Sequence, residues 1–203
     1  MKRTIVLALC GMLLSLGAAA QTFLNGIQVS HAKAEGVVHL ITGESLHFDK
    51  INIPGASDAN VKAKTAQRRD TTIKAKDIRA LELWNPKQPD SHWLFCYLPC
   101  KFPMAPNVWG VAVAVGDILS TYKVATTYNI NDDGDLVYVL RQGGFPNVVF
   151  YDAQQDDYLI WELKNKKKRA QFFEKDPDMA AKVLAGELYS SDYQYIVENY
   201  NPQ

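Results

Sequence analysis

The fold is decided by residues 109–140, which read WGVAVAVGDILSTYKVATTYNINDDGDLVYVL. Valines alternate with alanines over 111–115, which is the period-two pattern of a β-strand. Residues 118–130 continue as β-prone sequence, the run NDDGD at 131–135 interrupts them, and an apolar run follows at 136–140. An Asp-Gly pair between two β-prone runs is a strong hairpin signal, because the turn needs positive φ angles. The stretch therefore predicts consecutive antiparallel strands.

The sequence before this stretch predicts a further hairpin over residues 36–48, with its turn at Thr42–Ser45. If Ile41 pairs with Leu46, one face of that hairpin carries an apolar set, namely Val37, Ile41, Leu46 and Phe48. This register places His39 and His47 on opposite faces.

More strands are expected on both sides of the opening stretch. A strand is expected over 61–65, and residues 71–84 fit two strands separated by a break, after which Pro86 and Pro89 predict a loop. Residues 92–98 are a third apolar strand. Towards the C-terminus, residues 147–151 and 158–163 predict another antiparallel pair, with the turn at 152–157.

The last forty residues have a helical pattern. Asp176-Pro177 combines a capping carboxylate with proline at the first helical position. A second helix is expected after Ser190-Ser191-Asp192 and ends before Pro202. The sequence thus predicts an α+β fold that is mostly antiparallel β, a hairpin-rich sheet or partly open barrel, with two short C-terminal helices.

The N-terminus predicts export. Lys2 and Arg3 precede an apolar run over 5–16, and three alanines stand before Gln21, which is the layout of a secretory signal peptide. The run is too short to span a bilayer. The expected organisation is a signal peptide at 1–20, an antiparallel β-rich domain at 21–163, and a basic linker with a helical pair packed on the sheet at 164–203.

Charge and composition exclude some classes of partner. The chain has 22 basic and 22 acidic residues, and removal of Lys2 and Arg3 leaves 20 basic residues, a net charge of −2. Such a chain has no general attraction to nucleic acid or anionic membranes. No later run is long and apolar enough to cross a membrane, so we expect neither a nucleic-acid partner nor an integral membrane protein. The basic run 164–169 near Phe172 and Phe173 is expected to be a solvated join, with anion binding as its alternative.

No metal or cofactor is predicted. Residues 129–134 match the front of an EF-hand loop, but Leu140 stands where the loop needs a bidentate glutamate. We expect a turn there, with a calcium site of another kind as the alternative, formed by Asp132, Asp133 and Asp135. The four histidines lack the converging spacing of a zinc site and are expected to be structural or surface residues, namely His31, His39, His47 and His92.

No catalytic residue is predicted either. The chain has no Gly-x-Ser-x-Gly elbow, no Ser-x-x-Lys pair and no phosphate-binding glycine loop. A glycosidase acid/base pair would carry no such motif, so an enzyme is not excluded.

Cys96 and Cys100 lie on either side of Pro99 in the stretch HWLFCYLPCKF at 92–102. Their spacing is one residue longer than the redox Cys-x-x-Cys motif, and no second pair of ligands accompanies them. A strand keeps their α-carbons about 13 Å apart, beyond the roughly 7 Å limit for a disulfide. A bend at Pro99 would allow the bond. A disulfide and two buried thiols therefore both stay open.

Three segments resemble the small exported proteins of unknown function found in Bacteroidetes-type Gram-negative bacteria. These are the sequence AAAQ at 18–21, TTIKAKDIRALELW at 71–84, and FFEKDPDMAAKVLAGELYSSDYQYIVENYN at 172–201. The resemblance implies export to the periplasm or cell surface. It implies no catalytic residue.

Taken together, these features predict a non-catalytic exported protein that binds an envelope protein or glycan, or supports an envelope assembly. The expected contact surface is aromatic, with Trp84, Trp93, Tyr97 and Trp109 as its candidates. The alternative is a secreted hydrolase acting on glycans or peptides.

Overall fold

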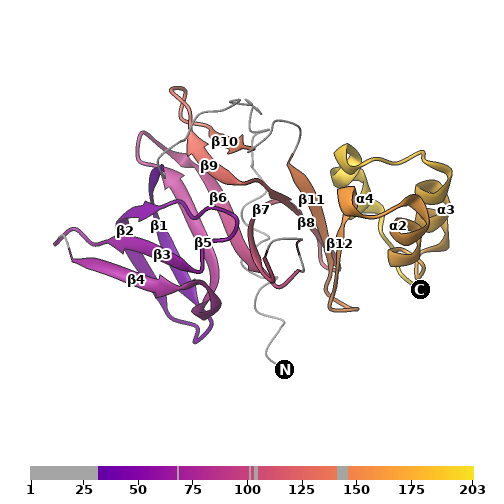
Figure 1. Ribbon diagram of the computed structural model, residues 1–203, viewed down its shortest axis with the longest axis horizontal. Helices are drawn as coiled ribbons and strands as arrows, with labels where there is room; N and C mark the ends of the chain where they lie inside the picture. The colour runs from indigo at the N-terminus through magenta and orange to yellow at the C-terminus, as the bar shows by residue number, and fades with distance from the viewer. Residues whose placement is uncertain (1–31, 68, 101, 103–104, 141–145) are drawn as a thin grey trace. The chain divides into compact units, whose positions relative to one another are not determined.

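The computed structural model describes residues 32–203, except residues 68, 101, 103–104 and 141–145 (Figure 1). Strands account for 48% of the chain and helices for 20%, which confirms an α+β fold dominated by antiparallel strands. The sheet is not closed, which agrees with the predicted hairpin-rich sheet or partly open barrel. The expected signal peptide lies outside the described residues.

The described residues form two compact units. The first, here the N-terminal unit, comprises residues 32–111 and 124–146, and the second, the C-terminal unit, comprises Ala112–Lys123 and Asn147–Gln203. This division differs from the predicted boundary at residue 163. The reason is that the strands over 147–160 share a hydrophobic core with the C-terminal helices.

The N-terminal unit is a series of antiparallel strands in the order β4-β3-β2-β1-β5-β6-β7. The strands are β1 (Lys33–Leu40), β2 (Ser45–Asn52), β3 (Asn60–Lys64), β4 (Asp70–Lys74), β5 (Ile78–Asn85), β6 (Gln88–Leu98) and β7 (Val108–Val115), and a 3₁₀ turn, η1 (Ala75–Asp77), separates β4 from β5. That turn is the predicted break within 71–84. The last residues of β7 belong to the C-terminal unit.

A separate two-stranded ribbon, β9 (Thr127–Ile130) and β10 (Leu136–Val139), confirms the Asp-Gly hairpin. Gly134 has a φ of +92°, a backbone conformation that residues with a side chain rarely adopt. The Asn131 side chain accepts a hydrogen bond from the Asp135 amide at 2.7 Å. The loop tip is thus closed by its own residues, as expected of a turn.

The predicted register of the β1–β2 hairpin is wrong. Leu46 pairs with Val38, and Ser45 pairs with His39. Residues 41–44 form the loop, in which the Leu40 amide donates to the Glu44 carbonyl at 2.8 Å, and Ile41 is 64% exposed. The pairing is displaced by an odd number of residues, so side chains expected on opposite faces share one face.

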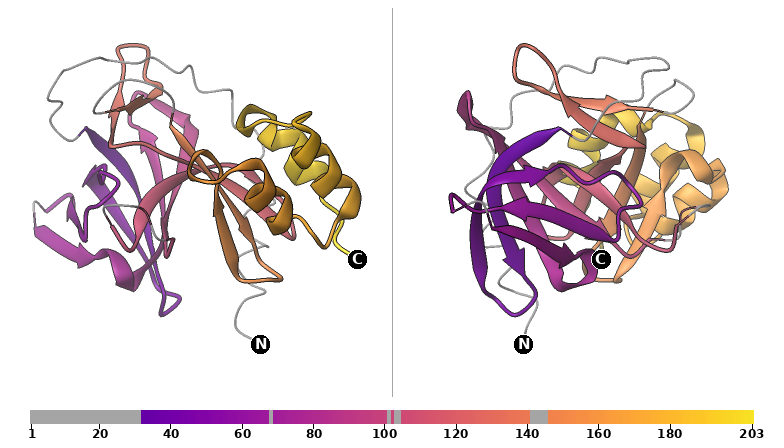
Figure 2. Two further views of the ribbon diagram at one scale, coloured as in Figure 1. Left: turned by 45° about the vertical axis from the view of Figure 1, so that its right-hand side comes forward. Right: turned by 60° about the vertical axis from the view of Figure 1, so that its left-hand side comes forward.

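The core of the N-terminal unit lies on one face of this sheet and includes the ribbon. Phe95 of β6 and Tyr128 of β9 meet edge to face with ring centroids 5.0 Å apart. The Tyr128 hydroxyl donates to the Trp109 carbonyl at 2.8 Å. Figure 2 shows the twist of the strands from two further directions.

The C-terminal unit combines strands in the order β12-β11-β8-β7 with three helices. Its elements are β8 (Leu119–Val124), β11 (Asn147–Asp152), β12 (Asp157–Ile160), η2 (Trp161–Leu163), α2 (Lys166–Phe172), α3 (Pro177–Ala185), η3 (Ser190–Asp192) and α4 (Tyr193–Asn199). The two predicted C-terminal helices are present as α3 and α4. The basic run, expected as a linker, begins a third helix, α2, because Asn165 caps it through the Lys168 amide.

The helices pack on the strands through aromatic residues. Phe173 contacts the rings of Phe150, Trp161 and Tyr200. Asp176 caps α3 as predicted, accepting from the Met179 amide at 3.0 Å. No helix in the described part of the chain is long and apolar enough to cross a membrane.

Candidate functional site

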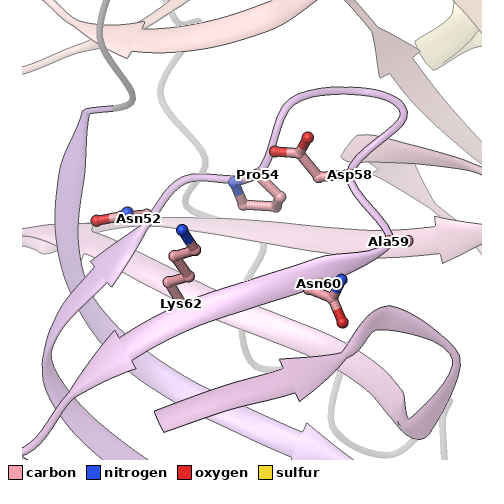
Figure 3. Close-up of a pocket in the computed structure, with 6 residues that line it drawn as sticks. All are labelled: Asn52, Pro54, Asp58, Ala59, Asn60 and Lys62. Atoms are coloured by element: carbon pink, nitrogen blue, oxygen red, sulfur yellow. The ribbon is translucent and has the colours of Figure 1, made fainter. Parts of the chain in front are cut away.

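One surface pocket of about 270 Å³ lies beside β3 in the N-terminal unit (Figure 3). It is lined by Asn52, Pro54, Asp58, Ala59, Asn60 and Lys62. The Asp58 carboxylate accepts a hydrogen bond from the Gly55 amide at 2.8 Å and so closes the loop that borders the pocket. Among the described residues that line it, Asp58 and Lys62 are the ionisable ones.

A second pocket of about 290 Å³ lies between α3 and α4. Its most buried ionisable group, Asp176, uses both carboxylate oxygens to hold the backbone, accepting from the amides of Met179 and Asn201 at 3.0 and 2.8 Å. Lys182 donates to the Tyr195 hydroxyl at 2.7 Å. The hydrogen bonds of Asp176 join the end of the chain to α3, and that of Lys182 joins α3 to α4. We therefore interpret the polar groups of this pocket as structural.

The richest collection of ionisable side chains lies on the face of the N-terminal sheet opposite its core. Cross-strand pairs place Glu35 beside Trp84 and Trp84 beside His92, while Val37 lies between His47 and Glu82. We call this surface the histidine face, defined by Glu35, His39, Ser45, His47, Asp49, Glu82, Trp84 and His92. It draws on β1, β2, β5 and β6.

Glu82 is shared by two histidines of this face. Its Oε1 lies 2.7 Å from His92 Nδ1, and its Oε2 lies 3.5 Å from His39 Nε2. The second nitrogen of His92 lies 2.6 Å from the Pro89 carbonyl, and that of His39 lies 2.9 Å from Ser45 Oγ. His39 Nε2 is buried and forms no hydrogen bond within the described residues. The cluster therefore fixes both rings.

Trp84 lies close to two imidazole rings, those of His92 and His47. It stacks on His92 with ring centroids 4.9 Å apart and an interplanar angle of 23°. The His47 centroid is 5.9 Å away, with the rings tilted by 39°. The indole is half-buried. Three rings on three strands thus form a continuous aromatic strip with an open side.

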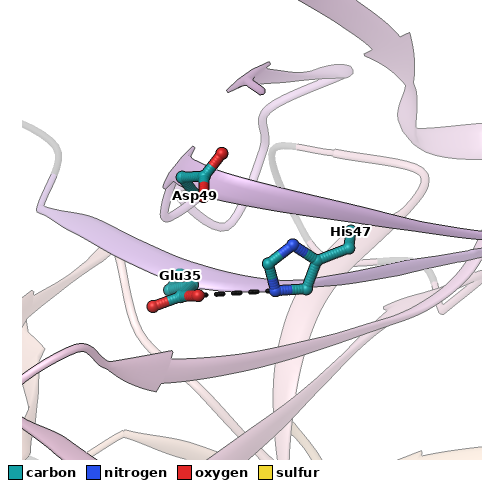
Figure 4. A group of neighbouring side chains, drawn as sticks. All are labelled: Glu35, His47 and Asp49. Carbon is teal, nitrogen blue, oxygen red and sulfur yellow. Dashed lines mark ion pairs between the residues drawn. The ribbon is translucent and has the colours of Figure 1, made fainter. Parts of the chain in front are cut away.

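The third feature of the histidine face is a group formed by Glu35, His47 and Asp49 (Figure 4). One ligand-type atom of each lies within 4.8 Å of the others, and Glu35 Oε1 is 3.4 Å from His47 Nε2. A bulge in the β1–β2 pairing brings them together: Ala34 pairs with Ile51 and Gly36 with Phe48, so Asp49 and Lys50 lie opposite Glu35 alone.

The aromatic contact surface expected from the sequence is not formed as a group. Trp93 is 4% exposed and Trp109 is fully buried, and both belong to the core. Tyr97 packs against that core and contacts the Trp109 ring at a centroid distance of 5.1 Å. Trp93 and Tyr97 alternate with Phe95 on the core-facing side of β6, and Trp109 lies on the neighbouring β7. Trp84 alone lies on the opposite face.

Cys96 and Cys100 are thiols in this structure. Burial raises the pKa of the Cys100 thiol to about 12, which keeps it protonated and unreactive at neutral pH. Cys100 therefore lacks the lowered pKa that a redox centre needs.

The comparisons with known proteins add no likeness. No protein-family model matches the chain, and no curated protein or solved structure matches it.

The residues of the histidine face were missed from the sequence because of one register error. His39 and His47 were expected on opposite faces and lie on the same one. Alternation within single strands carried the signal, since Glu35, Val37 and His39 occupy every second position, as do His47 and Asp49. The strand order that joins them is not encoded in any short motif.

Proposed function

We propose that this chain is an exported, non-catalytic binding protein of the cell envelope, and that it binds a glycan on the histidine face. The observation that carries the proposal is the half-buried Trp84 close to His47 and His92. The signal-peptide pattern at 1–20 supports export.

The chemistry of a sugar ring suits this surface. The face of an aromatic ring carries partial negative charge, and the C–H bonds on one face of a pyranose carry partial positive charge, so the two attract. Hydroxyl groups at the sugar's edge need hydrogen-bond partners beside that platform. Glu82 on β5 and Glu35 on the neighbouring β1 supply carboxylate oxygens, and His47 on β2 supplies a ring nitrogen.

The same residues argue against a protein partner at this site. The cores of protein interfaces are depleted of charged residues, because burying charges costs desolvation energy. Here the aromatic strip is surrounded by ionisable groups, namely Glu35, His39, Asp49 and Glu82. A polyhydroxylated ligand keeps such groups hydrogen-bonded.

The strip is also preorganised. His92 is held at both ring nitrogens, by Glu82 and by the Pro89 carbonyl. The residues stand on paired strands rather than on loops, so little conformational freedom is lost on binding.

A glycan array, together with co-sedimentation on purified peptidoglycan, tests the proposal with the chain from Gln21 onward. Trp84→Ala should weaken binding roughly tenfold or more, because aromatic stacking platforms contribute about 1–3 kcal/mol and 1.4 kcal/mol is a factor of ten. Tyr189→Ala is the matched control, since Tyr189 is 64% exposed on the C-terminal unit.

Three outcomes would overturn the proposal. The first is an absence of glycan binding, and the second is equal binding by wild type and Trp84→Ala. The third is release of shorter glycans during incubation, which would identify a hydrolase instead.

A further inference from the structure

We propose that Glu35, His47 and Asp49 bind a divalent cation of the Zn²⁺ class. The site shares Glu35 and His47 with the surface proposed to bind a glycan, but cation binding has its own test, which needs no glycan. It consists of two carboxylates and one imidazole, all on the outward side of the β1–β2 hairpin (Figure 4).

The separation of Glu35 and His47 fits shared ligation better than a hydrogen bond. Charge-assisted N–H···O bonds measure about 2.7–2.9 Å, as does the contact between His92 and Glu82 at 2.7 Å. The contact between Glu35 Oε1 and His47 Nε2 is 3.4 Å. Two neighbouring ligands of a tetrahedral ion with bonds of about 2.0–2.1 Å lie about 3.4 Å apart.

Asp49 is the third potential ligand of the group. Its carboxylate makes no hydrogen bond or ion pair with any described side chain or backbone group, yet it faces a second carboxylate and a histidine. A cation bound between the two carboxylates would be attracted by both. The bulge at Asp49 and Lys50 holds this arrangement, and bulges commonly re-aim side chains beside functional sites.

The ligand types select the ion. An imidazole nitrogen favours borderline cations such as Zn²⁺, whereas Ca²⁺ takes six to eight oxygen ligands. Three protein ligands leave a coordination position for water or for an incoming oxygen. That position opens towards solvent, since the His47 side chain is 53% exposed and Asp49 is exposed.

Neighbouring residues restrict the His47 ring in a way that suits a ligand. Its centroid lies 5.9 Å from that of the Trp84 ring. A cation at His47 would therefore lie close to the indole, which makes Trp84 a natural reporter of binding.

Isothermal titration of the metal-stripped chain from Gln21 with ZnCl₂ tests the site. We expect one ion per chain, with binding at least about tenfold weaker in both His47→Ala and Asp49→Asn, as for the loss of a ligand. Ca²⁺ and Mg²⁺ in excess should not compete. Circular dichroism of each variant checks that the fold is kept, which is expected because the side chains removed are exposed.

His92→Ala is the matched control. This histidine lies on the same face and is already held by Glu82 and Pro89, so its removal should leave Zn²⁺ affinity within about twofold. Paramagnetic Co²⁺ should quench part of the fluorescence of the wild type and much less in Trp84→Phe.

Failure of wild type to bind Zn²⁺ would overturn the proposal. So would unchanged affinity in both His47→Ala and Asp49→Asn, or loss of binding in His92→Ala alone, which would place the ion at Glu82. Glycan binding by a chain that does not bind Zn²⁺ would leave the proposed function standing and remove only this site.

Discussion

The indole of Trp84 stacks on the imidazole of His92, with centroids 4.9 Å apart and planes inclined by 23°. The two residues are direct cross-strand partners on β5 and β6. Because His92 is fixed by Glu82 and Pro89, the stack sets the orientation of the one tryptophan that faces away from the core. This relationship links the strand register to the proposed binding surface.

Fluorescence quenching should separate Trp84 from the other tryptophans. The chain has four, and Trp93, Trp109 and Trp161 are at most 4% exposed. Iodide should therefore quench one accessible component, and Trp84→Phe should remove it. Retention of that component in the variant would contradict the placement of Trp84 on an open face.

The buried Asp152 should stabilise the C-terminal unit. It accepts hydrogen bonds from the Tyr200 hydroxyl at 2.7 Å and from Gln155 Nε2 at 2.7 Å, besides two amides. Asp152→Asn replaces one carboxylate oxygen with an NH₂ group, so the side chain can no longer accept all of the hydrogen bonds that it accepts in the wild type. We expect it to lower the free energy of unfolding by about 1–3 kcal/mol, and Tyr200→Phe by less. Chemical denaturation of both variants measures this.

The same network predicts a pH dependence. Burial alone would raise the pKa of Asp152, but the hydrogen bonds from Gln155, Tyr200 and Gln154 outweigh it and hold the pKa below its usual value. A lowered carboxyl pKa contributes stability above the unfolded-state pKa near 4, and that contribution is lost as pH falls through the folded-state value. Wild type should lose stability on acidification more steeply than Asp152→Asn. Parallel curves would exclude this role.

Burial and desolvation raise the pKa of the Tyr200 hydroxyl, and its hydrogen bond to Asp152 raises it further. The pH dependence of stability therefore has the opposite sign for Tyr200. Its contribution to the free energy of unfolding is complete below the unfolded-state pKa near 10, and it is lost as pH rises through the folded-state pKa. Tyr200→Phe should flatten the alkaline limb of the stability profile.

The two thiols should differ in reactivity. Cys100 is 3% exposed and burial raises its pKa to about 12, while Cys96 is half-buried on β6. In the chain from Gln21, iodoacetamide should modify Cys96 first and Cys100 only after denaturation. Mass spectrometry after alkylation without reductant measures both; two unmodified, disulfide-linked cysteines would contradict the thiol state.

Local patterns predicted most of the strands and the two last helices, because alternation, Asp-Gly turns and the Asp176 cap depend on neighbouring residues. The β9–β10 hairpin and the α3 start are examples. The basic run was expected as a linker, although Asn165 stands in the capping position of α2. The linker was predicted from the charge of the lysines, and the capping role of Asn165 was not considered.

The candidate site could not be predicted in the same way, because it depends on long-range pairing. Glu35, Trp84 and His92 become neighbours only when β1 lies beside β5 and β5 beside β6. The β1–β2 bulge that places Asp49 opposite Glu35 has no sequence marker as clear as glycine in a turn. Nor did aromatic content separate Trp84 from the buried Trp93 and Trp109.

Protection of Trp84 by a bound glycan is the most direct test of the proposed function. Soluble peptidoglycan fragments would be titrated into the chain from Gln21 while iodide quenching is followed, with Trp84→Ala and Tyr189→Ala measured in parallel for affinity. The proposal predicts that fragments shield the accessible tryptophan, that Trp84→Ala weakens binding by roughly tenfold or more, and that Tyr189→Ala binds normally. Glycan binding that leaves Trp84 fully open to iodide, with unchanged affinity in Trp84→Ala, would contradict it.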